Sequence, residues 1–200
     1  MQDLLASLFN QFIQTSAIEW AATLTGILSF IFATQENSWT WPIGIVNVFC
    51  FAYIFIQHKI YGEALLQVYF LATAIYGWYF WNKQHLIKAK PILTLSFYTR
   101  IYTVIFTVVL GLLIGFLLAN YTDTDVAYPD GLCVAMCIVA QYLTSRKILE
   151  SWFLWILVDC CYIPLFFYKG LFLTCLLFVF YTFLAWKGYK NWLKSYHKFA

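Results

Sequence analysis

Charged side chains are scarce in this chain, at 10% of 200 residues. A soluble domain of this length carries charge on about a quarter of its positions, because its surface must face water. The composition therefore excludes a soluble enzyme, a nucleic-acid-binding protein and a disordered tail. What is present instead is 63% hydrophobic and 22% aromatic residues, which predicts an all-α integral membrane protein surrounded by the lipid bilayer.

Motifs of catalysis and of nucleotide binding are also missing. No GxxxxGK[ST] loop is present, so the chain is not expected to hydrolyse ATP. No HExxH, paired-histidine or GxSxG pattern suggests an intramembrane hydrolase. The six cysteines all lie in apolar runs, and Cys133 and Cys137, four residues apart, have no histidine nearby. We therefore expect no enzyme activity, disulfide, metal site or cofactor.

Apolar runs divided by polar breaks predict seven transmembrane helices. They are expected at 17–34, 41–57, 61–81, 97–119, 130–145, 151–168 and 171–190. Residues 1–16 contain apolar side chains at helical spacing but too few for a span. This segment is expected to be a short helix at the membrane interface.

The basic residues predict the orientation of these helices. Of the 12 lysines and arginines, ten fall on one side of a seven-helix arrangement, and only Lys59 and Lys169 fall on the other. A count of six or eight spans would scatter the ten over both faces. Since basic residues concentrate on the cytoplasmic side, we expect an external N-terminus and a cytoplasmic C-terminus. The ten residues are Lys83, Lys88, Lys90, Arg100, Arg146, Lys147, Lys187, Lys190, Lys194 and Lys198.

The chain also contains a candidate internal repeat. A shift of 111 residues aligns 41–81 with 152–192 and gives 10 identities in 41 positions. They include a glycine and two tryptophans at corresponding positions: Trp41 with Trp152, Gly77 with Gly188, and Trp81 with Trp192. Chance similarity between aromatic-rich helices is the simpler explanation, but shared glycine and tryptophan positions favour a repeat.

The repeat predicts a 3+1+3 architecture. Residues 17–81 and 130–192 would be three-helix units, and 97–119 would be a linker helix. Three helices end on the side opposite their start, so the linker gives both units the same orientation. Parallel repeats of this kind occur in SWEET-like transporters, where the substrate binds between the halves.

One carboxylate, Asp159, falls in the middle of the span 151–168. An aspartate at this depth costs about 2.5–3.5 kcal/mol on insertion scales, so it is expected to face the protein interior and to serve a function. Trp152, Trp155 and Tyr162 share its helical face. Aromatic planes beside a negative charge suit a flat, cationic ligand. Alternatively, Asp159 is protonated or hydrogen-bonded between two helices, and the tryptophans belong to the core.

Four other polar side chains lie in the predicted spans and are candidate substrate ligands: Glu63, Gln67, Asn47 and Gln141. Glu63 and Gln67 lie on one face of the span 61–81, and the shifted positions of the second unit lack both. For the amides, an interhelical hydrogen bond worth ~1 kcal/mol is an equally good explanation. Glu63 can also be a solvated carboxylate at the interface.

The chain resembles the PnuC family of nicotinamide riboside transporters over most of residues 17–192. Four elements carry the resemblance: WPxG at 41–44, GExLLQ at 62–67, GWxxW at 77–81 and WxxWxxxD at 152–159. The resemblance implies a SWEET-like vitamin transporter in the bacterial inner membrane. It also implies facilitated diffusion of nicotinamide riboside, trapping of the substrate by a cytoplasmic kinase, and homotrimers.

Three alternatives stay open from the sequence. Thiamine and nicotinamide riboside are both flat, cationic and hydroxyl-bearing, so a transporter for thiamine or another B-type vitamin fits the same residues. A lone membrane carboxylate also suits a proton-coupled symporter. A small channel or a receptor subunit is the third possibility, although isolated polar groups among aromatic side chains favour an occluded site over a continuous pore.

Overall fold

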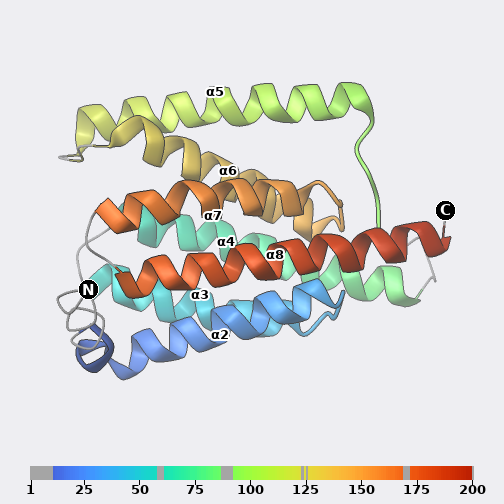
Figure 1. Ribbon diagram of the computed structural model, residues 1–200, viewed down its shortest axis with the longest axis horizontal. Helices are drawn as coiled ribbons and strands as arrows, with labels where there is room; N and C mark the ends of the chain where they lie inside the picture. The colour runs from blue at the N-terminus through green and yellow to red at the C-terminus, as the bar shows by residue number, and fades with distance from the viewer. Residues whose placement is uncertain are drawn as a thin grey trace.

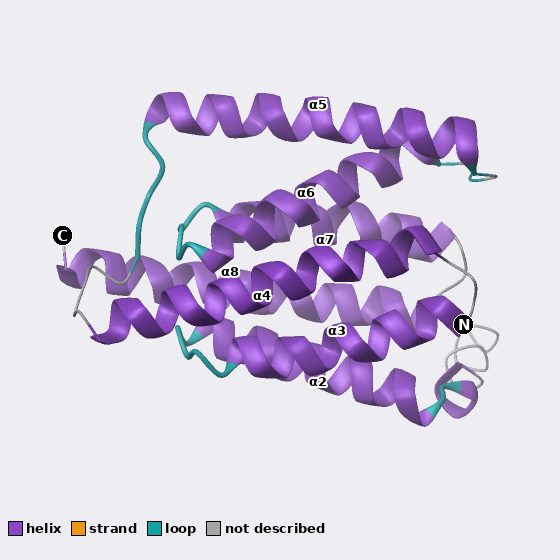
Figure 2. Cartoon of the chain, turned by 180° about the vertical axis from the view of Figure 1, so that it is seen from behind, coloured by secondary structure: helices purple, strands orange, loops and turns teal. Residues whose placement is uncertain are grey.

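The computed structural model describes residues 11–57, 61–86, 92–122, 124, 126–168 and 172–199. Long helices make up most of this part of the chain, and short loops join them (Figure 2). The helices are α2 (Ala17–Thr34), α3 (Thr40–Gln57), α4 (Tyr61–Leu86), α5 (Phe97–Tyr121), α6 (Ala127–Ser145), α7 (Ser151–Tyr168) and α8 (Phe172–Phe199).

These helices begin and end within three residues of the predicted bounds, except that two of them continue well past their predicted ends. The helices α4 and α8 continue past the predicted ends at residues 81 and 190, because neither proline nor glycine follows to stop them. By length and composition, α2, α3, α5, α7 and α8 are each able to cross a membrane. Of the predicted interfacial helix, residues 11–14 are helical, and residues 1–10 lie outside the described residues.

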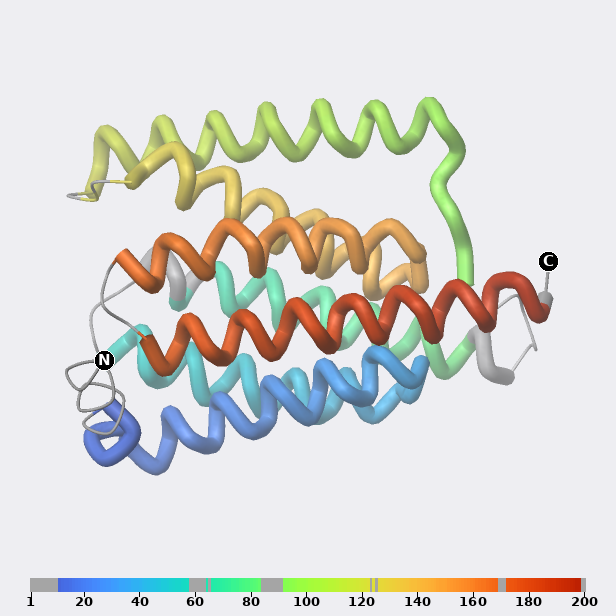
Figure 3. The backbone as a smooth tube through the Cα atoms, in the orientation of Figure 1, coloured from blue at the N-terminus to red at the C-terminus, as the bar shows by residue number. Residues whose placement is uncertain are grey.

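The helices run roughly side by side, and the start of α2 and the end of α8 lie at opposite ends of the bundle (Figure 1). The C-terminal ends of α2, α4, α6 and α8 all lie at the same end (Figure 1). We call this the C-terminal end of the bundle. The helix α5 lies apart along one side, preceded by the extended segment 92–96 and packed on α6 (Figure 3).

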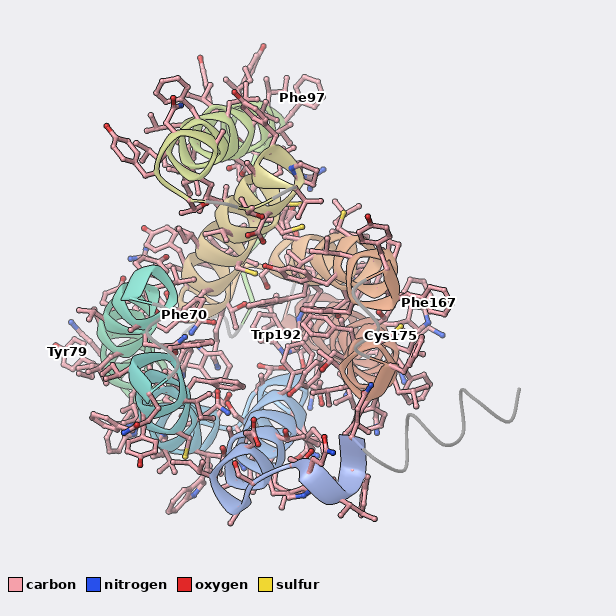
Figure 4. All side chains as sticks on the ribbon, turned by 90° about the vertical axis from the view of Figure 1, so that its left-hand side faces the viewer. Phe70, Tyr79, Phe97, Phe167, Cys175 and Trp192 are labelled. Atoms are coloured by element: carbon pink, nitrogen blue, oxygen red, sulfur yellow. The ribbon has the colours of Figure 1, made fainter. Side chains whose placement is uncertain are left out.

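Aromatic side chains cover much of the outer surface. Viewed end-on, the labelled Tyr79, Phe97 and Phe167 point away from the bundle (Figure 4), and each is more than half exposed. A soluble protein rarely exposes apolar surface on this scale, whereas a bilayer solvates it. The fold is therefore that of an all-helical membrane protein.

Two turns at the C-terminal end of the bundle have the same backbone geometry. Glu36 follows α2 with φ 56°, and Lys147 follows α6 with φ 55°, the only positive-φ residues other than glycine in the described part of the chain. Each donates its amide to the carbonyl three residues earlier, at 3.1 and 3.0 Å respectively. The next amide reaches the carbonyl five residues earlier, at 3.0 and 2.9 Å. These are Schellman caps, which usually use glycine.

Four tryptophans form the centre of the core. Trp41 and Trp81 meet edge to face at 5.2 Å and 87°, and Trp152 and Trp192 do so at 5.2 Å and 88°. Trp81 and Trp192 join the two pairs at 5.8 Å. All four side chains are buried, and Trp192 lies in the middle of the bundle (Figure 4).

Glycines make room for these rings. A Cβ on Gly77 would collide with the ring of Trp41, and one on Gly188 would lie 2.5 Å from the ring of Trp152. The indole nitrogens of the other two tryptophans then brace helix ends. Trp81 donates to the carbonyl of Ser145 at 3.1 Å, and Trp192 donates to that of Ala33 at 2.9 Å.

Small residues also hold α5 against α6. A Cβ on Gly131 would meet the backbone of Gly115 and would lie 2.7 Å from the carbonyl oxygen of Gly111. Backbone atoms cannot rotate aside as a side chain can. Close helix approach through small residues is a common packing mode in membranes.

We predict that Gly131→Ala lowers the stability of the protein by about 1–3 kcal/mol, because the added methyl group forces α5 away from α6. Thermal unfolding in detergent measures this change. Gly44→Ala is the matched control, since only the Ser29 hydroxyl oxygen, at 3.2 Å, lies near its new Cβ. Equal midpoints for the two variants would show that α5 does not depend on this crossing.

Candidate substrate site

Asp159 lies in the middle of α7 with only 3% of its surface exposed. Its Oδ2 oxygen is buried and accepts no hydrogen bond from the described residues. A buried carboxylate oxygen without a partner is costly, and intramembrane carboxylates are usually retained for a function. This oxygen is therefore the first candidate for a contact with a bound ligand.

The phenol of Tyr181 comes from α8 into the same region. It lies within electrostatic range of Asp159. Its hydroxyl also lies beside α2 and α3, because a Cβ on Gly26 would be 2.7 Å from the Tyr181 oxygen and 3.2 Å from the amide nitrogen of Asn47. Four helices, α2, α3, α7 and α8, thus converge around the carboxylate.

Phe30 of α2 connects the aromatic side chains of this region. Its ring lies 5.2 Å from that of Tyr181, 5.6 Å from Trp152 and 5.9 Å from Trp155. Neither Phe30 nor Tyr181 was a candidate from the sequence. A phenylalanine in an apolar span does not stand out in the sequence as a site residue. Tyr181 stands out only weakly, because its phenol hydroxyl lies deep in a predicted span.

The other predicted residues of α7 have different surroundings. Trp155 is half-buried and donates its indole N–H to the Thr144 hydroxyl at 3.0 Å. Trp152 is fully buried in the tryptophan core, and its indole nitrogen has no partner among the described residues. Tyr162, one helical turn after Asp159, stacks on Phe166, with the two ring centroids 5.3 Å apart. The predicted face of α7 therefore runs from the core, through Trp155, to the carboxylate.

The predicted amides divide between two regions. Asn47 donates to the Ala22 carbonyl at 2.5 Å and lies 3.2 Å from the Thr25 hydroxyl, so its nitrogen bonds α3 to α2 near Tyr181. Gln67 is buried on α4 and Gln141 is half-buried on α6. These two helices pack together on the other side, where Tyr69 donates to the Ile138 carbonyl at 2.7 Å.

Glu63, the remaining candidate, belongs to the first turn of α4, but its side chain lies outside the described residues.

Two surface cavities lie away from Asp159. One, of about 400 Å³, is an apolar groove between α6 and α7. The other, of about 490 Å³, lies at the C-terminal end of the bundle beside Arg100 and Glu150. Asp159 lines neither, and at 3% exposure it is closed off from solvent. A ligand reaches it only after helices move apart.

A bundle of apolar helices that encloses a buried carboxylate among aromatic rings is typical of a membrane protein, and the Asp159 oxygen, unpaired among the described residues, is a candidate contact for a small molecule. Comparison with known proteins agrees. The model of the nicotinamide mononucleotide transporter family matches residues 16–194, and the chain belongs to this family. The protein is thus a multi-pass membrane transporter and not an enzyme.

Individual relatives cover nearly the whole chain. The nicotinamide riboside transporter PnuC of Escherichia coli is 29% identical and aligns with 90% of this chain and 86% of its own. The riboflavin/roseoflavin transporter RibM of Streptomyces davaonensis is 28% identical over 92% of this chain and 87% of its own. The crystal structure of the vitamin B3 transporter PnuC superposes with a TM-score of 0.76 at 25% identity, covering 98% of this chain and 91% of that one.

Proposed function

We propose that this protein takes up nicotinamide riboside across the bacterial inner membrane by facilitated diffusion. The observation that carries the proposal is the buried, unpaired Oδ2 of Asp159 in a chain that is similar to nicotinamide riboside transporters over most of its length. The pyridinium ring of this substrate is flat and positively charged. A carboxylate neutralises the charge, and the rings of Trp155 and Tyr181 offer faces for stacking and cation–π attraction.

The proposed site contains Asp159, Trp155, Tyr162, Tyr181 and Asn47. Asn47 and Tyr181 would bond the ribose hydroxyls, since both present polar atoms beside Gly26. Gln67 and Gln141 would line the path on the α4 and α6 side, and Glu63 stays a predicted substrate ligand. Trp152 would support Trp155 from within the core rather than contact the substrate in the present conformation.

Riboflavin is the second candidate, because RibM matches this chain almost as well as the E. coli transporter does. The isoalloxazine ring is neutral, so it gains nothing from a buried carboxylate. Calorimetry with purified protein should therefore detect binding of nicotinamide riboside and none of riboflavin. Thiamine, which is also cationic, is the third ligand in the same experiment. Tighter binding of either of the other vitamins would reassign the substrate.

Residues 17–81 and 130–192 would be two parallel three-helix repeats, with 97–119 as the linker helix between them. The matched tryptophan pairs, the matched Gly77 and Gly188, and the matched turns at Glu36 and Lys147 all differ by the same 111 residues. This paired geometry supports a repeat over chance similarity of sequence. The substrate would bind between the repeats, with Asp159 supplied by the second.

We predict that the C-terminal end of the bundle is cytoplasmic. Arg146, Lys147 and the basic end of α8 lie there, and such residues resist translocation. A reporter enzyme fused after residue 200 should be active in the cytoplasm, and one inserted at residue 124 should be active in the periplasm. The opposite pattern would reject the orientation, and activity of both reporters on the same side would reject an odd number of spans between them.

Trapping and assembly complete the proposal. Facilitated diffusion only equilibrates the substrate across the membrane, so its accumulation would need a cytoplasmic kinase that phosphorylates it, as the family resemblance implies. Residues 1–16 would lie at the external membrane interface. Homotrimers, as the family resemblance implies, would bury part of the exposed apolar surface.

A further inference from the structure

An ion pair joins the two matching turns at the C-terminal end of the bundle. The Glu36 Oε2 oxygen lies 3.9 Å from the Lys147 Nζ nitrogen. The two side chains are only 17% and 9% exposed, so the charges meet away from bulk water. Their sequence numbers differ by the repeat shift of 111 residues, and each has the left-handed backbone of its cap. The pair therefore links equivalent positions of the two proposed repeats.

Each turn is fixed to its surroundings by other groups. The Lys147 ammonium lies over the Trp81 ring at 4.7 Å, and the carbonyl of Lys147 accepts from the Leu93 amide at 2.9 Å. On the other side, Asn191 donates to the Thr34 carbonyl at 3.2 Å. Glu36 and Lys147 are thus presented to each other by turns that are already well ordered.

Charge is a poor choice for a permanent contact here. Burial lowers the pKa of Lys147, while the nearby Glu36 raises it. Burying two charges costs solvation, and an apolar pair of similar size often serves a static interface as well or better. A contact that must break and re-form needs side chains that are stable both together and apart. Charged groups are stable both when paired and when separately hydrated, whereas separated apolar groups would be exposed to water.

We propose that Glu36 and Lys147 form the latch of the gate at the C-terminal end of the bundle. The latch is closed in this structure, and it separates when the two repeats part to open the substrate path on that side. The inference rests on the proposed two-repeat carrier and adds the residues that control one of its openings. It does not depend on which vitamin is transported.

Thr34 provides a reporter for the opening. It is the last residue of α2, it is 1% exposed, and it lies two residues before Glu36. In a Thr34→Cys background, a membrane-impermeant maleimide applied to inside-out vesicles should react slowly while the latch is closed. The matched background without this substitution accounts for the six native cysteines.

Breaking the latch should expose the reporter. We expect Glu36→Gln and Lys147→Gln each to raise the labelling rate of the Thr34→Cys protein at least about fivefold, through a shift toward the open state. The double reversal, Glu36→Lys with Lys147→Glu, should bring the rate back toward that of the parent. Both positions share one backbone conformation, so the exchange requires no new turn.

Arg100→Gln is the matched control. Arg100 pairs with Glu150 at 2.8 Å at the same end of the bundle, but this pair joins α5 to the start of α7 and does not link the two turns. Its labelling rate should equal that of the parent. An unchanged rate in both single variants, an equal rise with Arg100→Gln, or no rescue by the double reversal would each overturn the latch.

A replacement variant and the independence of labelling from the substrate keep the outcome interpretable. If Lys147→Gln does not fold, as judged by gel filtration, Glu36→Asp replaces it, because the shorter side chain lengthens the pair without removing a charge. Labelling needs no substrate. Failure of nicotinamide riboside to bind would therefore reject the proposed substrate and leave the test of the latch intact.

Discussion

Replacing Asp159 with asparagine is expected to weaken the binding of nicotinamide riboside about 10- to 100-fold, or ~1.4–2.7 kcal/mol. The substitution keeps the size of the side chain and removes the only charge at the centre of α7. The cationic ring would then lose its counter-ion in a site closed off from water, where the attraction is strongest. The folded protein should remain intact, because burying an amide costs less than burying a carboxylate.

Calorimetry on detergent-purified protein measures this loss. Asp130→Asn is the matched control, since it removes a carboxylate from the first turn of α6 and should leave the affinity unchanged. Proteoliposomes test the coupling. Under facilitated diffusion, an imposed proton gradient should not change the final distribution of substrate. If the gradient drives accumulation and Asp159→Asn abolishes it, the protein is a proton symporter and the carboxylate carries the proton.

Helix positions were predictable because the bilayer imposes a local rule. A span needs about 20 apolar residues in a row, and a reader of the sequence sees such a run directly. This length rule does not predict how far a helix continues beyond the apolar part of its sequence. The last turns of α4 and α8 carry lysines, asparagines and histidines, which end a hydropathy segment but not a helix. Their true ends were therefore missed by five residues in α4 and nine in α8.

The candidate site was only half predictable for a related reason. Asp159 is visible because one charge in an apolar run is anomalous wherever the helix packs. Phe30 and Tyr181 lie at the candidate site because α2 packs against α8, and these two helices are far apart in sequence. Similarly, the repeat shift relates Glu36 to Lys147, but equivalence in sequence does not place two residues in contact. Contact would also require both turns to lie close to the axis that relates the two proposed repeats.

Trp152 shows how one spacing supports two roles. Residues three and four apart share a helical face, and that face extends from the core at one end of α7 to Asp159 in the middle. Trp152 packs against Trp192 and Gly188, while Trp155, one turn further on, is half-buried beside Phe30. Periodicity alone cannot tell which tryptophan would support the fold and which would face a ligand.

Substitution of the two tryptophans separates these roles. Trp152→Ala is expected to lower stability by about 3–5 kcal/mol, because it leaves a cavity beside Trp192 in the centre of the core. Trp41→Ala, at the equivalent position, should cost a similar amount. Trp152→Phe should cost much less, since the indole N–H has no partner to lose. Thermal unfolding in detergent compares the three variants.

Trp155→Ala should affect substrate binding more than stability. It removes a half-buried ring, so its effect on stability should be smaller, but the binding of nicotinamide riboside should weaken by about 1–3 kcal/mol through the loss of stacking and cation–π contact. Trp155→Phe, which keeps a ring face, should recover part of the affinity in calorimetry. If Trp152→Phe weakens binding while the midpoint of unfolding stays that of the parent, then Trp152 contacts the substrate directly, and the site extends into the tryptophan core when the repeats move apart.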